Sequence, residues 1–199
     1  MLIAGTGGLG KEIMGFLIDD GVPASEITFF DESQNGEEKL FGQFRIIRSG
    51  DELKDFLTSQ PEFIVGIGHP RIREEVVLRI EKAGGKLVSA ISAKAHIFHY
   101  NEKPEGIIIQ PGVGISHNAK FGRGCAIHIN STIGHSAKIG KFVNVGPNVS
   151  VIGPISIGDY SYIAAQSVLL PGLKIGRNVV VSAGSLVNRD MADYESFPG

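Results

Sequence analysis

Aliphatic residues recur at every sixth position through the second half of the chain. Counting in sixes from residue 109 to residue 187 meets fourteen apolar residues in a row, with no insertion. An amphipathic helix repeats every 3.6 residues and a half-buried strand every two, so neither gives a period of six over this length. The residues in phase are Ile109, Ile115, Phe121, Ile127, Ile133, Ile139, Val145, Val151, Ile157, Ile163, Leu169, Ile175, Val181 and Val187.

Small residues keep fixed places within this repeat. The position two before the aliphatic residue is small or aliphatic, as at Ala119 and Cys125, and the position after it is often glycine, as at Gly122 and Gly134. The pattern predicts a triangular coil in which each hexad forms one flat face, the aliphatic residue points inward and a small residue turns the corner. Three hexads complete one turn, and successive turns stack at strand spacing, about 4.8 Å.

The predicted coil resembles the left-handed parallel β-helix of hexapeptide-repeat proteins. Its phase extends backward to Ile97 and Ile91 but meets one polar residue, Lys103, so we expect the first turn to be irregular. We assign residues 93–199 to this all-β domain.

Residues 1–92 show a different alternation, in which short apolar runs are separated by amphipathic ones. The segments "LIAGT", "EITFF", "EFIVGIG" and "KLVSAI" predict strands, and "KEIMGFLIDDG" and "PRIREEVVLRIEKAGG" predict helices. Alternating strands and helices imply a parallel sheet with crossover helices. We therefore predict an α/β, Rossmann-like N-terminal domain over residues 1–92.

The first strand of this domain runs into a glycine-rich turn. The pattern Gly5-x-Gly7-x-x-Gly10, with Asp31 about twenty residues on, matches the dinucleotide-binding fingerprint, which places backbone N–H groups against phosphate oxygens. A full dinucleotide fold needs two mononucleotide halves, and about 90 residues hold one. We therefore predict a site for one nucleotide diphosphate, although a glycine turn can also serve only to close a helix on a strand. The predicted substrate-binding residues are Gly7, Gly8, Leu9, Asp31 and Gly68.

Composition narrows the function classes. The net charge is −2 and no basic run occurs, so nothing favours a nucleic-acid partner or an anionic membrane. No segment approaches the roughly 20 apolar residues of a membrane span, and "MLIAGTGGLG" lacks the charged region and cleavage site of a leader. The single cysteine, Cys125, excludes an internal disulfide and fits a reducing cytoplasm, where we expect the protein to act. Cys125 itself is expected in the core.

Both halves together carry a family resemblance. The segments "GTGGLG", "FFDES", "VGIGHPRIR", "STIGHSAKIGKFVNVGP", "YIAAQSVLLPGLKIG" and "VVSAGSLVNRD" follow in order the pattern of the bacterial sugar acyltransferases, which join a nucleotide-binding domain to a left-handed β-helix. These include N-acetyltransferases of nucleotide-linked amino sugars, of the bacillosamine and perosamine type, and sialic acid O-acetyltransferases. The resemblance implies acetyl-CoA-dependent N-acetylation of a nucleotide-linked amino sugar in surface-glycan biosynthesis, with sugar O-acetylation as the alternative. It also implies a homotrimer with sites between subunits.

The resemblance assigns His135 as the catalytic general base, in direct transfer within a ternary complex. Imidazole, with an ordinary pKa near 6.5, can take a proton from an amine at neutral pH. Gly153 lies one predicted turn further, where a backbone N–H could meet the thioester carbonyl. Relatives often carry a second histidine at Asn144 and an acidic neighbour beside the base, where this chain has Gly134 and Ser136. The acetyl-CoA-binding residues implied are Asn144, Gly153, Ala165 and Ala183.

The sequence also allows other roles for the histidines. His99, His117 and His135 are spaced by eighteen and could form a column on one edge. Hexapeptide coils also build γ-class carbonic anhydrases, in which histidines from adjacent subunits hold a metal, so a metal site is the rival interpretation. Stacking at about 4.8 Å does not by itself converge three ligands, so we expect no metal. His99 and His117 are then exposed edge residues, and His128 is a corner residue facing a neighbouring subunit. Arg73 is expected as a solvated helix residue, with phosphate binding as the alternative. A non-catalytic β-helix subunit is the remaining alternative.

Overall fold

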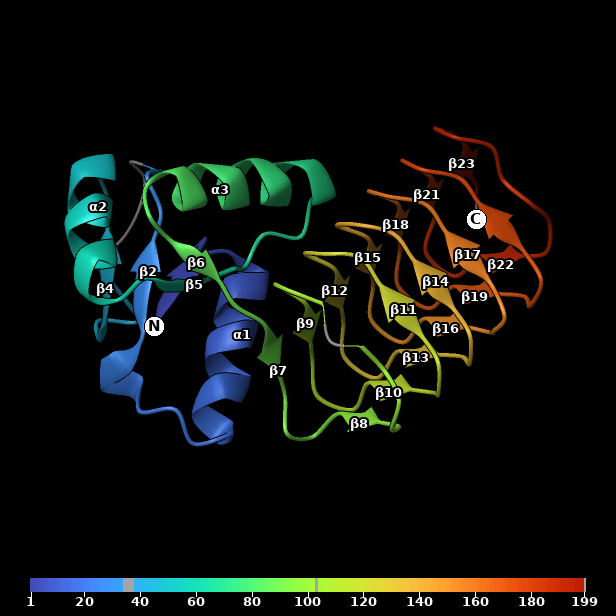
Figure 1. Ribbon diagram of the computed structural model, residues 1–199, viewed down its shortest axis with the longest axis horizontal. Coiled ribbons are helices and arrows are strands. Elements are labelled where there is room, and N and C mark those ends of the chain that lie inside the picture. The colour runs from blue at the N-terminus through green and yellow to red at the C-terminus, as the bar shows by residue number, and fades with distance from the viewer. Residues whose placement is uncertain (34–37, 103, 199) are drawn as a thin grey trace. The chain divides into compact units, whose positions relative to one another are not determined.

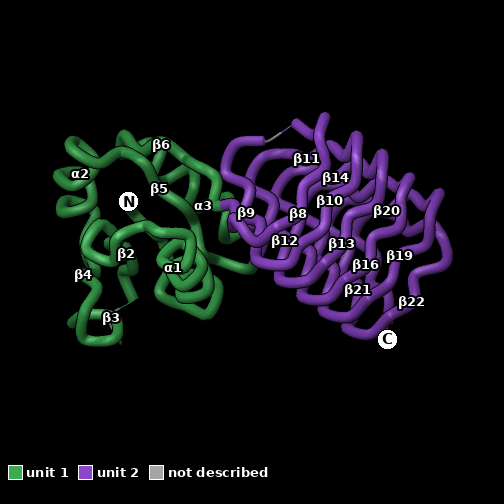
Figure 2. Tube along the Cα trace, turned by 90° about the horizontal axis from the view of Figure 1, so that it is seen from below, with its two compact units in different colours: residues 1–68, 72–90 green, residues 69–71, 91–199 purple. Residues whose placement is uncertain are grey.

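The computed structural model describes residues 1–33, 38–102 and 104–198. The chain divides into two compact units, which Figure 2 shows in different colours. Unit 1 comprises residues 1–68 and 72–90, and unit 2 comprises residues 69–71 and 91–199. Among the described residues, no helix is long and apolar enough to cross a membrane.

Unit 1 is a six-stranded sheet with helices on both faces. The strands, in the spatial order β3-β4-β2-β1-β5-β6, run parallel except for β3, which is antiparallel to β4. Helix α1 covers one face, and α2 and α3 cover the other (Figure 1). The strands are β1 (Leu2–Ala4), β2 (Thr28–Phe30), β3 (Lys39–Leu40), β4 (Phe44–Ile47), β5 (Glu62–Val65) and β6 (Lys86–Leu87). The helices are α1 (Gly8–Asp19), a short 3-10 turn (Ala24–Glu26), α2 (Gly50–Ser59) and α3 (Pro70–Lys82).

The central strands of unit 1 are apolar on both sides because helices cover both faces of the sheet. All three residues of β1 are buried, as are those of β2. The carboxyl ends of β1, β2 and β5 meet at one edge of the sheet, where the glycine turn, Asp31 and the loop after β5 follow. This edge positions the candidate site of unit 1.

Unit 2 is a triangular coil of two-residue strands in three parallel sheets, here called faces I, II and III (Figure 1). Face I holds β7 (Ala90–Ile91), β9 (Ile108–Ile109), β12 (Ala126–Ile127), β15 (Asn144–Val145), β18 (Tyr162–Ile163), β21 (Val180–Val181) and β23 (Ser196–Phe197). Face II holds β8 (His96–Ile97), β10 (Gly114–Ile115), β13 (Thr132–Ile133), β16 (Ser150–Val151), β19 (Val168–Leu169) and β22 (Leu186–Val187). Face III holds β11 (Lys120–Phe121), β14 (Lys138–Ile139), β17 (Ser156–Ile157) and β20 (Lys174–Ile175). This stacking fits the left-handed parallel β-helix expected from the repeat.

The register of the coil follows the predicted three hexads per turn. Ile115 pairs with Ile133, and Ile133 pairs with Val151, so each inward residue lies against its counterpart one turn away. Of the fourteen residues in phase, all but Phe121 are buried, and Phe121 packs against the same core. Ile91 and Ile97 also pack against this core, whereas Lys103 lies outside the described residues.

Two local expectations need correction. The segment "KLVSAI" is two strands rather than one, because β6 belongs to unit 1 and β7 to the coil. The glycine that follows the aliphatic residue does not supply the left-handed backbone of the corner. That conformation lies two residues later, as at Asn118 and Ser136, with φ of 57° at both. Glycine at the earlier position instead allows close stacking, because a Cβ on Gly134 would overlap the backbone of Gly153 one turn on.

Candidate functional site

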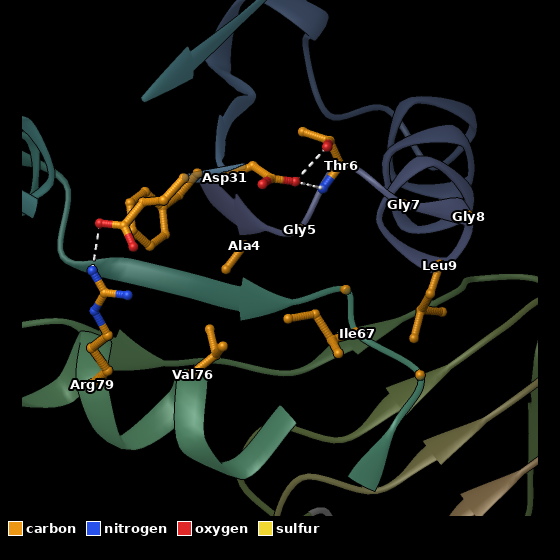
Figure 3. Close-up of a pocket in the computed structure, with 14 residues that line it drawn as sticks. Ala4, Gly5, Thr6, Gly7, Gly8, Leu9, Asp31, Ile67, Val76 and Arg79 are labelled. Atoms are coloured by element: carbon orange, nitrogen blue, oxygen red, sulfur yellow. Dashed lines mark hydrogen bonds and ion pairs between the residues drawn. The ribbon is translucent and has the colours of Figure 1, made fainter. Parts of the chain in front are cut away.

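Unit 1 carries a pocket of about 380 Å³ at the carboxyl edge of its sheet. Figure 3 shows the glycine turn on one side, Asp31 at the end of β2, and Ile67, Val76 and Arg79 on the other side. The structure gathers around this one pocket all of the residues predicted for substrate binding, which are Gly7, Gly8, Leu9, Asp31 and Gly68. Whether they bind substrate stays a prediction.

The glycines at this edge serve two different purposes. Gly10 packs against the carbonyl of Gly5, and a Cβ on Gly66 would overlap the Cα of Gly10, so these positions need glycine to close helix on strand. In contrast, a Cβ on Gly7 or Gly8 would meet no atom within 4 Å. Packing therefore accounts for only part of the glycine-rich turn. Gly7 is also the N-cap of α1, and no side chain caps this helix, so the positive end of α1 opens toward the pocket.

Asp31 fixes the shape of the glycine turn. Its Oδ2 accepts hydrogen bonds from the N–H of Thr6, at 3.0 Å, and from the Thr6 hydroxyl, while its Oδ1 accepts from the N–H of Ser33 at 2.9 Å. Burial alone would raise the pKa of Asp31, but the hydrogen bonds from Ser33 and Thr6 outweigh it and lower the pKa to about 2. The carboxylate is thus ionised at neutral pH and anchors two loops at the pocket.

Arg73 corrects an expectation from the sequence. Rather than being solvated, its side chain is buried, with 1% exposed, and Nη1 donates to the carbonyls of Ile67 at 2.7 Å and Gly68 at 2.8 Å. Arg73 therefore holds the loop after β5, which lines the pocket. The helical spacing offered the missed signal, because Arg73 shares its face of α3 with the buried Val77 and Ile80.

Glu32 and Arg79 line the same pocket and were also missed. The Arg79 guanidinium forms an ion pair with the Glu32 carboxylate, and the hydrogen bond to Glu32 raises the pKa of Arg79 further. This pair joins the loop after β2 to α3. Glu32 directly follows Asp31 in the sequence, which was the available signal.

His135 lies exposed on the corner between faces II and III. Its ring is stacked on the ring of His117, one turn before, with centroids 5.4 Å apart and planes at 10°. Gly153, one turn after, contacts it directly, because a Cβ on Gly153 would overlap the His135 carbonyl oxygen. Gly153 is buried, and no described residue accepts a hydrogen bond from its N–H. The structure therefore brings the predicted base together with a backbone donor that has no partner among these residues.

The other residues predicted for acetyl-CoA lie around a different corner, between faces I and II. Asn144 lies on β15 with 1% of its surface exposed, and its Oδ1 is 3.1 Å from Nε2 of His128. Ala165 and Ala183 occupy successive turns of the same corner. Within one chain, this group does not meet His135 and Gly153. His128 was predicted only as a corner residue, and its link to Asn144 could have been suspected from their shared corner.

The alternative of a metal-binding histidine column gains no support from the geometry. In the described part of the chain, no three His, Cys, Asp or Glu side chains are grouped as a metal ion requires. His117 and His135 stack face to face, an arrangement that does not direct ring nitrogens at a common point. Cys125 is buried in the core, and its thiol donates to the carbonyl of Gly140 at 3.0 Å.

Two family models match the chain. Residues 1–80 match the PglD N-terminal domain, and residues 136–170 and 154–189 match the bacterial transferase hexapeptide (six repeats). A curated relative, named "Putative acetyltransferase YvoF" from Bacillus subtilis (strain 168), is 52% identical over 42 residues, which is 21% of this chain and 24% of that protein. The chain thus matches about a quarter of this relative's length.

Solved structures resemble nearly the whole chain. PerB from Caulobacter crescentus, in complex with CoA and GDP-perosamine, is 25% identical with a TM-score of 0.85, over 96% of this chain and 90% of that one. WeeI from Acinetobacter baumannii AYE is also 25% identical, with a TM-score of 0.88, over 98% and 94%. The acetyltransferase domain of PglB from Neisseria gonorrhoeae FA1090, in complex with acetyl coenzyme A, shares the fold at 22% identity and a TM-score of 0.89, over 98% and 93%.

The two family models fall on the two units in the order that the resemblance of the sequence motifs implies. A PglD-type domain followed by a hexapeptide coil is a specific pairing, whereas hexapeptide repeats alone occur in many transferases. The chain thus combines a PglD-type N-terminal domain with the hexapeptide repeats of bacterial transferases, and it resembles the bacterial sugar acyltransferases.

Proposed function

We propose that this protein is an acetyl-CoA-dependent N-acetyltransferase of a nucleotide-linked amino sugar, with His135 as the general base. The observation that carries the proposal is the contact between His135, exposed on a rigid corner, and the backbone of Gly153, whose N–H no described residue accepts. A base beside an unused backbone donor is what acyl transfer to an amine requires. The solved complex of PerB with CoA and GDP-perosamine supports the choice of substrates.

The reaction follows from these two groups. The lone pair of the neutral sugar amine attacks the thioester carbonyl carbon while Nε2 of His135 accepts the proton that the amine loses. The Gly153 N–H donates a hydrogen bond to the oxyanion that forms. The carbon–sulfur bond then breaks, and the CoA sulfur takes the proton from the His135 imidazolium to leave as a free thiol. No covalent enzyme intermediate is needed, so both substrates bind before transfer.

The pocket of unit 1 supports a nucleotide acceptor. Gly7 and Gly8 leave open space at the uncapped start of α1, which suits a diphosphate. Asp31, Gly68 and Leu9 line the rest of the pocket, within reach of sugar hydroxyls or phosphate. A volume of about 380 Å³ is near the lower end of the range for small-molecule sites, which favours one nucleoside diphosphate over a dinucleotide.

We assign acetyl-CoA to the corner between faces I and II, along Ala165 and Ala183. Because Asn144 is buried, it acts through His128: its Oδ1 accepts the Nε2 hydrogen and so fixes the tautomer of that ring. The small side chains at Ala165 and Ala183 let a thin pantetheine arm lie against the backbone. Surface-glycan biosynthesis in the cytoplasm is the corresponding setting, and the single, buried cysteine, Cys125, fits it.

A homotrimer would complete the site. The base and the acetyl-CoA groove lie on different corners of one coil, so a second copy must bring its groove to the base of the first. Exposed apolar side chains on faces I and II support such packing, among them Tyr162, Val180 and Leu186. Closed three-fold symmetry would give three equivalent sites.

The test measures CoA release from acetyl-CoA with a panel of UDP- and GDP-linked amino sugars and their hydroxyl counterparts. His135→Ala should lower kcat by about 10² to 10⁴, whereas the exposed His96→Ala serves as a matched control and should leave kcat unchanged. Equal turnover by the wild type and His135→Ala would overturn the assigned base. Acceptance of hydroxyl sugars alone would replace N-acetylation with O-acetylation.

A further inference from the structure

We propose that His117 is a positioning residue for His135, and that its turn of the coil takes the orienting role that an acidic neighbour would otherwise have. This inference rests on the proposed function of His135. Gly134 and Ser136 flank the base, and no carboxylate among the described residues hydrogen-bonds to its ring. An exposed imidazole without such a partner is free to rotate, so something else must hold it.

Three contacts connect the His117 turn to the His135 turn. The two rings stack in parallel, with centroids 5.4 Å apart. The N–H of Ser136 donates to the His117 carbonyl at 3.1 Å, and Asn118 Nδ2 donates to the Ser136 hydroxyl at 3.4 Å. The base and the residue after it are therefore held by one neighbouring turn.

The Ser136 hydroxyl provides the link to the base. Its Oγ is 3.5 Å from Nδ1 of His135 and 3.4 Å from Nδ2 of Asn118, so it can accept a long hydrogen bond from each. In that arrangement Nδ1 carries the hydrogen and Nε2 keeps its lone pair. This is the tautomer that a general base acting through Nε2 requires.

Stacking supplies the remaining restraint. Rotation of the His135 ring about its Cβ–Cγ bond would break the parallel contact with His117, so the flat neighbour limits the ring to few orientations. A base held in one orientation reacts faster because less orientational freedom is lost on the way to the transition state. The contribution should therefore appear in kcat and leave substrate binding unchanged.

The experiment compares His117→Ala, His117→Phe and the wild type in the full-length protein. His117→Ala should lower kcat about threefold to tenfold with both KM values unchanged. His117→Phe keeps a flat ring and should recover most of the loss. His99→Ala, which removes the histidine one turn earlier, is the matched control and should leave kcat unchanged.

A second readout does not depend on turnover. Nitrogen-15 NMR of the histidine rings should show the Nδ1–H tautomer of His135 in the wild type and in His117→Phe, and a mixture of tautomers in His117→Ala. If none of the acceptors is acetylated, the proposed function fails, yet this measurement still decides the role of His117. Unchanged kcat and an unchanged tautomer in His117→Ala would overturn the proposal. An equal loss of kcat in His117→Ala and His117→Phe, together with lower thermal stability, would also overturn the proposal, because it would show that His117 has a structural role.

Discussion

The two units hold their candidate sites in opposite ways. In the coil, the surroundings of His135 are its own counterparts one turn away, His117 before it and Gly153 after it. In unit 1, one particular side chain holds each loop of the pocket, and no repeat supplies an equivalent one. Asp31 holds the glycine turn, and Arg73 holds the loop after β5. In the coil, similar contacts between successive turns therefore position the site residue. In the α/β unit, a few individual hydrogen bonds do so.

This difference determines what a substitution does. In the coil, a residue can be judged from its place in the hexad and from the residues eighteen positions away. In unit 1, the individual hydrogen bonds decide. Four substitutions test this contrast, and three of them have a control at a position that the contrast predicts to be tolerant.

The largest effect is expected for Gly153→Ala in the coil. The added methyl group would overlap the His135 carbonyl oxygen, so two turns must separate. We expect the free energy of unfolding to fall by about 3 kcal/mol, measured by urea denaturation. Gly114→Ala is the control, because its Cβ would lie 3.7 Å from the Thr132 methyl, an ordinary contact. Equal stability of the two variants would show that the coil does not depend on glycine stacking.

The coil shows how much of this fold could be predicted from sequence. The fourteen residues in phase and the pairing of Ile115 with Ile133 follow from a period that any reader can count. Corner geometry was less accessible, because the left-handed backbone falls at Ser136 rather than at Gly134. The six-residue period shows which residues occupy equivalent positions in the coil, but it does not show which backbone torsion angles each position requires.

Unit 1 was harder to predict because individual contacts, and not a repeat, determine its structure. No helix or strand was predicted between residues 38 and 60, where β3, β4 and α2 lie. The five residues predicted for the pocket do line it, because a known loop motif and the carboxyl edge of a parallel sheet specify them. Arg73 was misjudged because a charged residue is usually exposed, and only the carbonyls of Ile67 and Gly68 explain its burial.

The second prediction concerns Arg73→Met. Removing the guanidinium leaves two carbonyls without this donor, and we expect unfolding of unit 1 to become about 2 kcal/mol easier. Arg79→Met is the control on the same helix: its ion pair with Glu32 is exposed and should contribute under about 1 kcal/mol. Thermal denaturation of both variants provides the measurement. A larger loss for Arg79→Met would contradict the assignment of Arg73 as the support of the loop.

The third prediction is the pH dependence of Asp31→Asn. Because folding lowers the pKa of Asp31 from 3.8 to about 2, the carboxylate stabilises the fold above its unfolded pKa and loses that contribution as the pH falls from about 4 to 2. Allowing for partial exposure, we expect Asp31→Asn to cost about 1 kcal/mol at neutral pH. The difference in the free energy of unfolding between the wild type and Asp31→Asn, measured by urea denaturation, should become smaller as the pH falls from about 4 to 2. A difference that stays constant would show that the shape of Asp31, and not its charge, holds the turn.

The smallest effect on stability is expected for Gly8→Ala. Its Cβ would meet no atom within 4 Å, and alanine is favoured over glycine in a helix, so stability should rise by up to about 0.5 kcal/mol. Binding should respond in the opposite direction, because the methyl group occupies the open start of α1 where we place the diphosphate. Titration calorimetry with UDP and GDP would measure this loss of affinity, with Gly15→Ala, another open glycine of α1 that does not line the pocket, as the control. Gly8→Ala is thus the converse of Gly153→Ala: the coil uses glycine to bring its own turns together, whereas here glycine keeps space for a ligand. Unchanged affinity in Gly8→Ala would remove that distinction and reduce the glycine turn to a packing device.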